Sequence, residues 1–84
     1  MNKLEIQSRI LKKLANFSKW NEAHTEEINA LKVLPKHMRG SKLAIQALEE
    51  LYKLEFILKY HKTGETHISL NIRKKKEIEE LLDL

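Results

Sequence analysis

The hydrophobic period of this sequence changes near residue 54, and that change limits the folds open to the chain. Up to this point apolar side chains recur every three or four positions, as in amphipathic helices; beyond it they alternate with polar ones, as in strands. The predicted helices cover about 3–17, 25–34, 41–54 and 73–82, and the predicted hairpin strands about 56–62 and 66–72. We therefore predict a mostly α fold with a small antiparallel β-hairpin (α+β), in one domain of residues 1–84, because so short a chain builds one core.

Residues with good helix-capping side chains stand before each predicted helix. The predicted N-caps are Asn2, Thr25, Ser41 and Asn71. Glu5 completes a capping box at the first of them. Pro35 should end the second helix, because the residue before a proline is pushed out of the helical region.

Each of the first three helical patterns has one apolar face. The inward sets are Ile6, Ile10, Leu11, Leu14 and Phe17 in the first, Ile28, Leu31 and Leu34 in the second, and Ala44, Ala47, Leu48 and Leu51, widened by Ile45 and Tyr52, in the third. The third helix leaves Lys42, Gln46, Glu49 and Lys53 on the opposite stripe. Only that stripe is free to meet a partner.

Gly64 marks the turn of the predicted hairpin. A Gly64-Glu65 centre would suit a type II′ turn, with Thr63 and Thr66 flanking it. The hairpin then presents one apolar face to the helices and covers the open side of their core.

Cationic residues concentrate in the middle of the chain. Residues 35–76 contain ten Lys or Arg and four acids, which leaves a net −2 for the rest of a chain whose total charge is +4. A basic segment between acidic flanks is typical of a polyanion-binding face on an ordinary domain. With no cysteine and no apolar run longer than three residues, we expect a cytoplasmic protein without a membrane segment or disulfide.

The sequence gives little support for a metal site or for catalysis. The four histidines, at 24, 37, 61 and 67, have neither cysteine partners nor the i, i+4 spacing of helical ligand pairs. No glycine-rich phosphate loop or nucleophile with a base at a recognisable spacing is present. We therefore expect no enzyme, no metal, no cofactor and no small-molecule ligand.

Several short motifs resemble a known family. The segments "HT" before the second helix, "PKHMRG" before the third, and "KTG" and "SLN" in the hairpin resemble the small archaeal winged helix-turn-helix DNA-binding proteins over about residues 24–71. "PKHMRG" and "SLN" are the most specific of these. Related wings commonly have a glycine where this chain has Glu55. The resemblance implies binding of double-stranded DNA, usually in transcriptional regulation, with the third helix in the major groove and the hairpin as wing.

The side chains at these positions fit such a role. Lysine and serine contact phosphates, arginine pairs with guanine and glutamine with adenine. The predicted DNA-binding residues are Lys36, His37, Arg39, Ser41, Lys42 and Gln46 around the third helix, and Lys59, His61, Lys62 and Thr63 in the wing. The acidic pair Glu49 and Glu50 favours docking by the N-terminal half of the helix.

Four alternatives stay open. Arg39 could hold the preceding turn by bonding backbone carbonyls instead of contacting DNA. The domain could be a protein–protein interaction module of a larger nucleic-acid-processing assembly, which the mixed charge of the third helix would suit. RNA could bind the same basic face, although no exposed aromatic platform for single strands is apparent. The first helix, or the last with Ile78, Leu81 and Leu82, could form a homodimer interface or fold back on the core.

Overall fold

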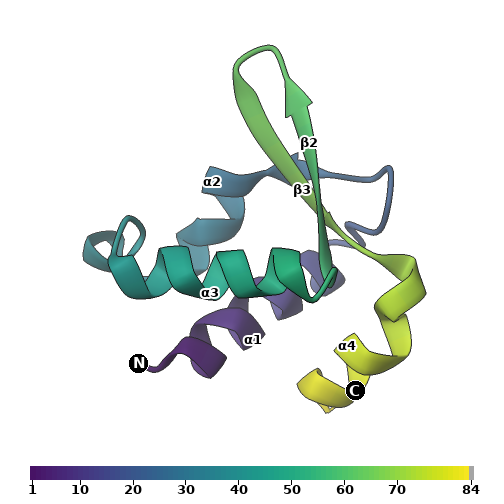
Figure 1. The fold of residues 1–84 in the computed structure, drawn as a ribbon, viewed down its shortest axis with the longest axis horizontal. Helices are drawn as coiled ribbons and strands as arrows, with labels where there is room; N and C mark the ends of the chain where they lie inside the picture. The colour runs from purple at the N-terminus through teal and green to yellow at the C-terminus, as the bar shows by residue number, and fades with distance from the viewer. Residues whose placement is uncertain (84) are drawn as a thin grey trace.

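The computed structural model describes residues 1–83 and shows that they form an α+β domain in which a hairpin projects from a helical body (Figure 1). The elements in chain order are α1 (Lys3–Asn16), β1 (Thr25–Glu26), α2 (Glu27–Ala30), η1 (Leu31–Val33), η2 (Lys36–Met38), α3 (Lys42–Lys53), β2 (Ile57–Lys62), β3 (Glu65–Leu70), η3 (Ile72–Lys74) and α4 (Lys75–Leu82). The η elements are single 3₁₀ turns. The described residues thus contain four α-helices and a three-stranded antiparallel sheet.

The first helix is confirmed, together with its cap. The Asn2 side chain accepts a hydrogen bond from the Glu5 backbone N–H at 2.8 Å, which satisfies one of the free donors of the first turn. The predicted inward residues Ile6, Ile10, Leu11 and Leu14 are all buried. Phe17 was wrongly placed in this set: it is 65% exposed, because the helix ends at Asn16 and Phe17 is already the C-cap.

The third helix is also confirmed, and it packs against α1. Ser41 caps α3 by accepting from the Ala44 N–H at 3.2 Å. The four predicted inward residues, Ala44, Ala47, Leu48 and Leu51, are buried, whereas Ile45, predicted to widen this face, is exposed. A side-chain hydrogen bond crosses the helix pair, from Gln7 Nε2 to the Ala47 carbonyl at 3.2 Å. Small residues on α3 therefore let the two backbones come close.

The prediction for residues 25–34 was wrong at its start. Thr25 does not cap a helix; Thr25 and Glu26 form β1, which pairs with Ile68 and His67 of β3. The α-helix then lasts one turn, from Glu27, and tightens into η1. Its inward face also differs from the prediction, because Leu34 is buried but Ile28 is 62% exposed. Pairing with a distant strand has overridden the local helix signal.

The sheet has the order β1-β3-β2, and its two faces differ. Ile57, Ile68 and Leu70 form the core side and are buried at 2% exposure or less. Tyr60 and His67 lie opposite each other on the other side and are half-buried. The hairpin was predicted correctly, although β2 begins one residue later than expected, and β3 begins one residue earlier and ends two residues earlier.

The hairpin turn differs from the prediction. Lys62 pairs with Glu65, so Thr63 and Gly64 form the loop, with φ of 42° and 79°. Positive φ at both positions corresponds to a type I′ turn, not the type II′ turn expected around Gly64 and Glu65. The I′ geometry matches the right-handed twist of the strands.

The last helix folds back on the core of its own chain. The Asn71 side chain accepts from the Arg73 N–H at 3.1 Å and caps η3, not the α-helix for which it was predicted, because α4 begins only at Lys75 and has no side-chain cap. Ile78 is fully buried and Leu82 packs against the core, whereas Leu81 remains 38% exposed. Of the two roles proposed for this segment, the structure shows core packing. Within residues 1–83, no helix has the length and apolar character needed to cross a membrane.

Candidate nucleic-acid interface

Four predicted DNA-binding residues lie exposed around the start of α3. Lys36 and His37 belong to η2, and Lys42 and Gln46 belong to the outer stripe of α3. Because Pro35 and the η2 turn lead directly into the Ser41 cap, both lysines flank the N-terminal end of the helix. This end carries the positive pole of the helix dipole, which adds to the attraction of an anion.

Two further predicted residues are already engaged within the protein. The Arg39 guanidinium donates from Nε to the Leu34 carbonyl at 3.0 Å and from Nη2 to the Lys32 carbonyl at 3.4 Å. The Ser41 hydroxyl donates to the Met38 carbonyl at 2.7 Å and accepts the α3 capping bond. Arg39 therefore has the turn-holding contacts of the alternative interpretation, and Ser41 has a structural role as cap.

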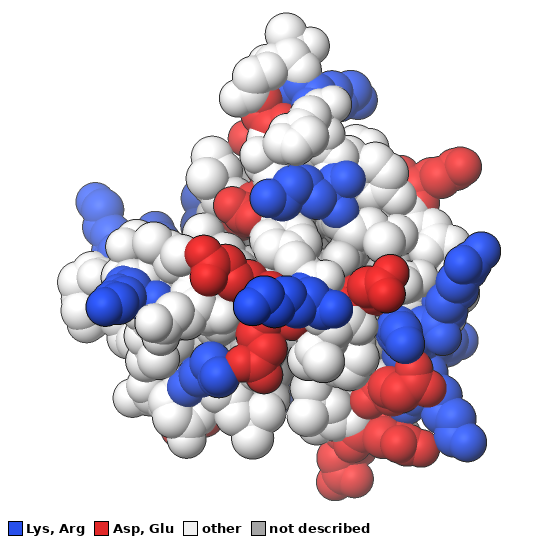
Figure 2. All heavy atoms as spheres, in the orientation of Figure 1, with Lys and Arg blue, Asp and Glu red and all other residues white. Residues whose placement is uncertain are grey.

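The outer face of α3 is basic only at its beginning. Figure 2 shows cations without adjacent carboxylates over the N-terminal end of α3, and interleaved cations and carboxylates over its middle and C-terminal end. Glu49 is exposed on this face. Glu50 turns toward α1 and pairs with Lys3, whose ammonium lowers the pKa of the Glu50 carboxyl by hydrogen bonding to it. One acid of the predicted pair thus lies away from the outer stripe.

The predicted wing cations lie on different faces of the hairpin. Lys59 and His61 share the face of the sheet that looks toward α3, whereas Lys62 lies on the opposite face, across from Glu65. The Lys59 ammonium sits 4.4 Å from the ring centroid of Tyr52, a cation–π contact that fixes it between hairpin and helix. The structure therefore does not bring these three side chains to one surface.

A partly buried hydrogen bond joins α3 to α2 in this region. The Tyr52 hydroxyl donates to the Glu27 carboxylate, and burial together with this bond raises the pKa of Tyr52 above its ordinary value. The contact ties α3 to α2 under the hairpin. Thr63 stands apart from it, exposed at the hairpin tip with Lys62 beside it.

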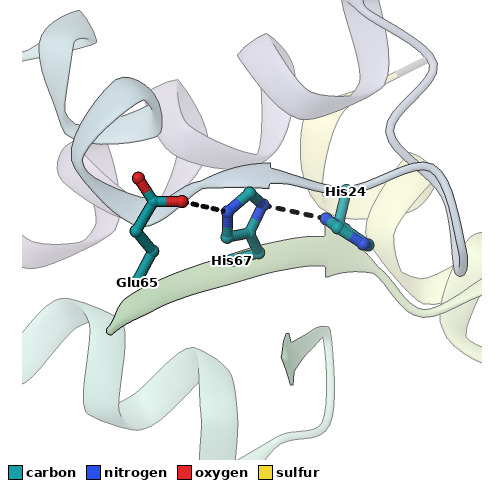
Figure 3. Close-up of polar contacts among 3 residues, drawn as sticks. All are labelled: His24, Glu65 and His67. Carbon is teal, nitrogen blue, oxygen red and sulfur yellow. Dashed lines mark hydrogen bonds and ion pairs between the residues drawn. The ribbon is translucent and has the colours of Figure 1, made fainter. Parts of the chain in front are cut away.

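Sequence reasoning missed a histidine cluster on the outer face of the sheet (Figure 3). His24 Nδ1 lies 2.9 Å from His67 Nδ1, and His67 Nε2 lies 3.1 Å from a Glu65 carboxylate oxygen. Because that carboxylate can only accept, we infer that His67 donates to it from Nε2; in neutral His67 the Nδ1 atom then accepts from His24 Nδ1. The His24 ring also stacks on Tyr60, with centroids 4.9 Å apart.

The surroundings of His24 disfavour its charged form. Partial burial of His24, followed by the nearby His67, Lys62 and Lys19, lowers its pKa below the ordinary 6.5. His61 does not join this cluster, because it lies on the other face of the hairpin from His67. Within residues 1–83, no group of three or more His, Cys, Asp or Glu side chains could hold a metal ion. The register of β1 with β3, which brings His24 near His67, was the missing signal.

The cationic run at residues 73–76 lies away from α3. Arg73 and Lys74 line an open hollow of about 870 Å³ beside the hairpin, together with Trp20, Tyr60 and the acids Glu22 and Glu55. Mixed charge at its rim and half-buried aromatics in its wall make it unlike a continuous basic surface. Comparison with protein-family models, with curated proteins and with solved structures found no match to this chain.

Proposed function

We propose that this chain is a non-enzymatic winged helix-turn-helix domain that binds double-stranded DNA, with α3 in the major groove and the β2–β3 hairpin as wing. The order of three helical segments followed by a hairpin supports this assignment. The connection over residues 34–41 is longer than the helix-turn-helix turn of about three to four residues, and the η2 turn occupies it.

One observation carries the proposal: the path into α3 is free of acids. Residues 35–48 contain no Asp or Glu, and they expose Lys36, His37, Lys42 and Gln46. The lysines would neutralise phosphates, and Gln46 could pair with an adenine edge. Glu49 is the first acid along the helix, so the N-terminal half would enter the groove and the C-terminal half would stay outside it.

The hairpin tip would add contacts to the neighbouring backbone. Lys62 and Thr63 are exposed at the tip, and His61 is exposed on the α3 side of the sheet. Lys59 would contribute only after leaving Tyr52. DNA binding in this geometry would serve transcriptional regulation.

The interleaved charges over the rest of α3 favour a second candidate, a protein-interaction module (Figure 2). Glu49 and Lys53 alternate along the exposed stripe, as expected for a surface that matches both charge signs of a partner. Such a partner would tolerate changes at Lys36 that a duplex would not.

The test is a salt titration of binding to a fluorescent random-sequence duplex. We compare the wild type with Lys36→Gln/Lys42→Gln, and with Lys75→Gln/Lys76→Gln as a matched control that removes two exposed cations from α4. Each lost phosphate contact should flatten the slope of log K against log salt by about 0.9, so the α3 variant should lose about 1.8 and the control nothing. A wild type with a flat salt response, or equal losses in both variants, would contradict duplex binding through α3. Arg39 is left intact because its loss would release the loop before α3.

A further inference from the structure

A second cationic surface lies on α1 and η1. An open hollow of about 500 Å³ is lined by Arg9, Lys12, Lys13, Asn16, Phe17, Lys32 and Val33. Four of these seven residues are Lys or Arg, and none is an acid. We call this set the α1 basic surface. It shares no residue with the proposed duplex-binding face.

The helical period explains why these side chains gather. Residues 9, 12, 13 and 16 follow one another at spacings of three, one and three, so they share one side of α1, where residues 9, 12 and 16 are exposed and Lys13, next to the buried stripe, is half-buried. Lys13 also fixes the position of the neighbouring segment, because its Nζ donates to the Asn29 carbonyl at 2.6 Å. This bond holds α2 and η1 against α1 and brings Lys32 to the same hollow.

Phe17 gives this surface a second property. Phe17 is 65% exposed, although burying a side chain of this size typically stabilises a fold by about 1.5–3 kcal/mol. The sequence-based expectation that the chain exposes no aromatic platform is therefore wrong. An exposed ring beside four cations is the combination with which proteins bind single strands, since the cations track phosphates and the ring stacks on a base.

The charges also decide which partner fits. A second copy of this chain would bring like charges together on this face, which opposes association. A duplex would satisfy the cations, but its bases are stacked on one another and cannot cover Phe17. A single strand offers both phosphates and free base faces.

We propose that the α1 basic surface binds a single strand of nucleic acid, with Arg9, Lys12 and Lys32 on phosphates and a base stacked on Phe17. The proposal is independent of duplex binding through α3. If both hold, the domain can contact a duplex and an adjoining single strand at the same time.

The test measures anisotropy of a fluorescent pyrimidine 15-mer with the full chain. Phe17→Ala should weaken binding by about 5- to 150-fold, the loss of one stacked base, whereas Phe17→Tyr should stay near the wild type. Lys12→Gln/Lys32→Gln should flatten the salt slope by about 1.4, the value for two contacts on a single strand. Lys36→Gln/Lys42→Gln removes two cations that do not line this hollow, serves as matched control and should leave strand binding unchanged.

Three results would overturn the proposal: no strand binding by the wild type at low salt, no effect of Phe17→Ala, or loss of strand binding in the Lys36→Gln/Lys42→Gln control. Duplex affinity of the same proteins, measured in parallel, separates this failure from failure of the α3 proposal. Circular dichroism and the emission of Trp20, which packs against the core, verify that every variant is folded.

Discussion

Replacing Thr63 by asparagine should stabilise the domain, because threonine suits its position poorly. Thr63 and Gly64 form the whole hairpin loop, and both have positive φ. A two-residue loop of this kind is a type I′ turn, for which Asn-Gly is strongly preferred over Thr-Gly. The threonine hydroxyl forms no hydrogen bond within residues 1–83, and the side chain is exposed. Few favourable contacts are therefore lost on substitution.

The size of the effect follows from the backbone. A left-handed conformation costs an L-residue about 1–2 kcal/mol, and a β-branched side chain makes it worse, whereas asparagine visits this region readily. Thr63→Asn should therefore raise the free energy of unfolding by about 0.5–1 kcal/mol. In a domain of this size, that gain raises Tm by about 2–8 °C.

Thermal unfolding followed by circular dichroism, with urea titration as a second measure, tests this expectation. Thr66→Asn is the matched control: it makes the same substitution within β3, where asparagine is disfavoured, and should lower stability by up to about 1 kcal/mol. A Thr63→Asn variant no more stable than the wild type would refute the turn assignment. An equal gain in both variants would trace the effect to asparagine itself and not to the turn.

Three further perturbations test the core, the α3 cap and the histidine cluster. Ile10→Ala should lower the free energy of unfolding, measured by urea titration, by about 2–5 kcal/mol, and Ile28→Ala by about 0.5 kcal/mol or less, because Ile10 is fully buried and Ile28 is 62% exposed. Similar losses in the two variants would contradict the burial assignment. Ser41→Ala should lower the free energy of unfolding by about 1 kcal/mol, whereas Ser41→Asp, which keeps a capping oxygen, should not. An unchanged urea midpoint for the alanine variant would show that this cap does not stabilise the domain. The free energy of unfolding should fall as the pH drops below 6.5, because the pKa of His24 is lowered in the folded state, whereas His24 in the unfolded chain takes up a proton there. Thermal unfolding at about pH 7.5 and 5 should therefore show a smaller loss of stability for His24→Gln than for the wild type. An equal loss in both proteins would exclude His24 as a cause.

The two long helices could be predicted from the sequence because their signals are local. Asn2 and Ser41 cap them, and each helix has an apolar stripe long enough to define its period. The two-residue strand β1 could not be predicted in this way, since two residues show no period. Its existence depends on Ile68 and His67, which lie more than forty positions along the chain. Non-local pairing also brought His24 to His67.

The candidate interface was predictable in part for the same reason. The outward direction of Lys42 and Gln46 follows from the helical period alone. Two contacts could not be predicted without knowing which elements pack together: the hydrogen bonds of Arg39 to backbone carbonyls, and the cation–π contact of Lys59 with Tyr52. Lys32 likewise joins the cations of α1 only because α2 and η1 fold against that helix.

The number of free cations limits how tightly the proposed duplex face can bind. With Arg39 and Lys59 engaged within the protein, Lys36, Lys42 and Lys62 remain as exposed cations from the predicted set. Three phosphate contacts correspond to a salt slope of about −2.7, against the six to ten contacts of many specific DNA-binding proteins, so a single domain should bind duplex weakly at physiological salt. A measured slope much steeper than about −3 would mean that Lys59 leaves Tyr52, or that a second copy or a second surface contributes. The stoichiometry of the complex then separates a second copy from the other two.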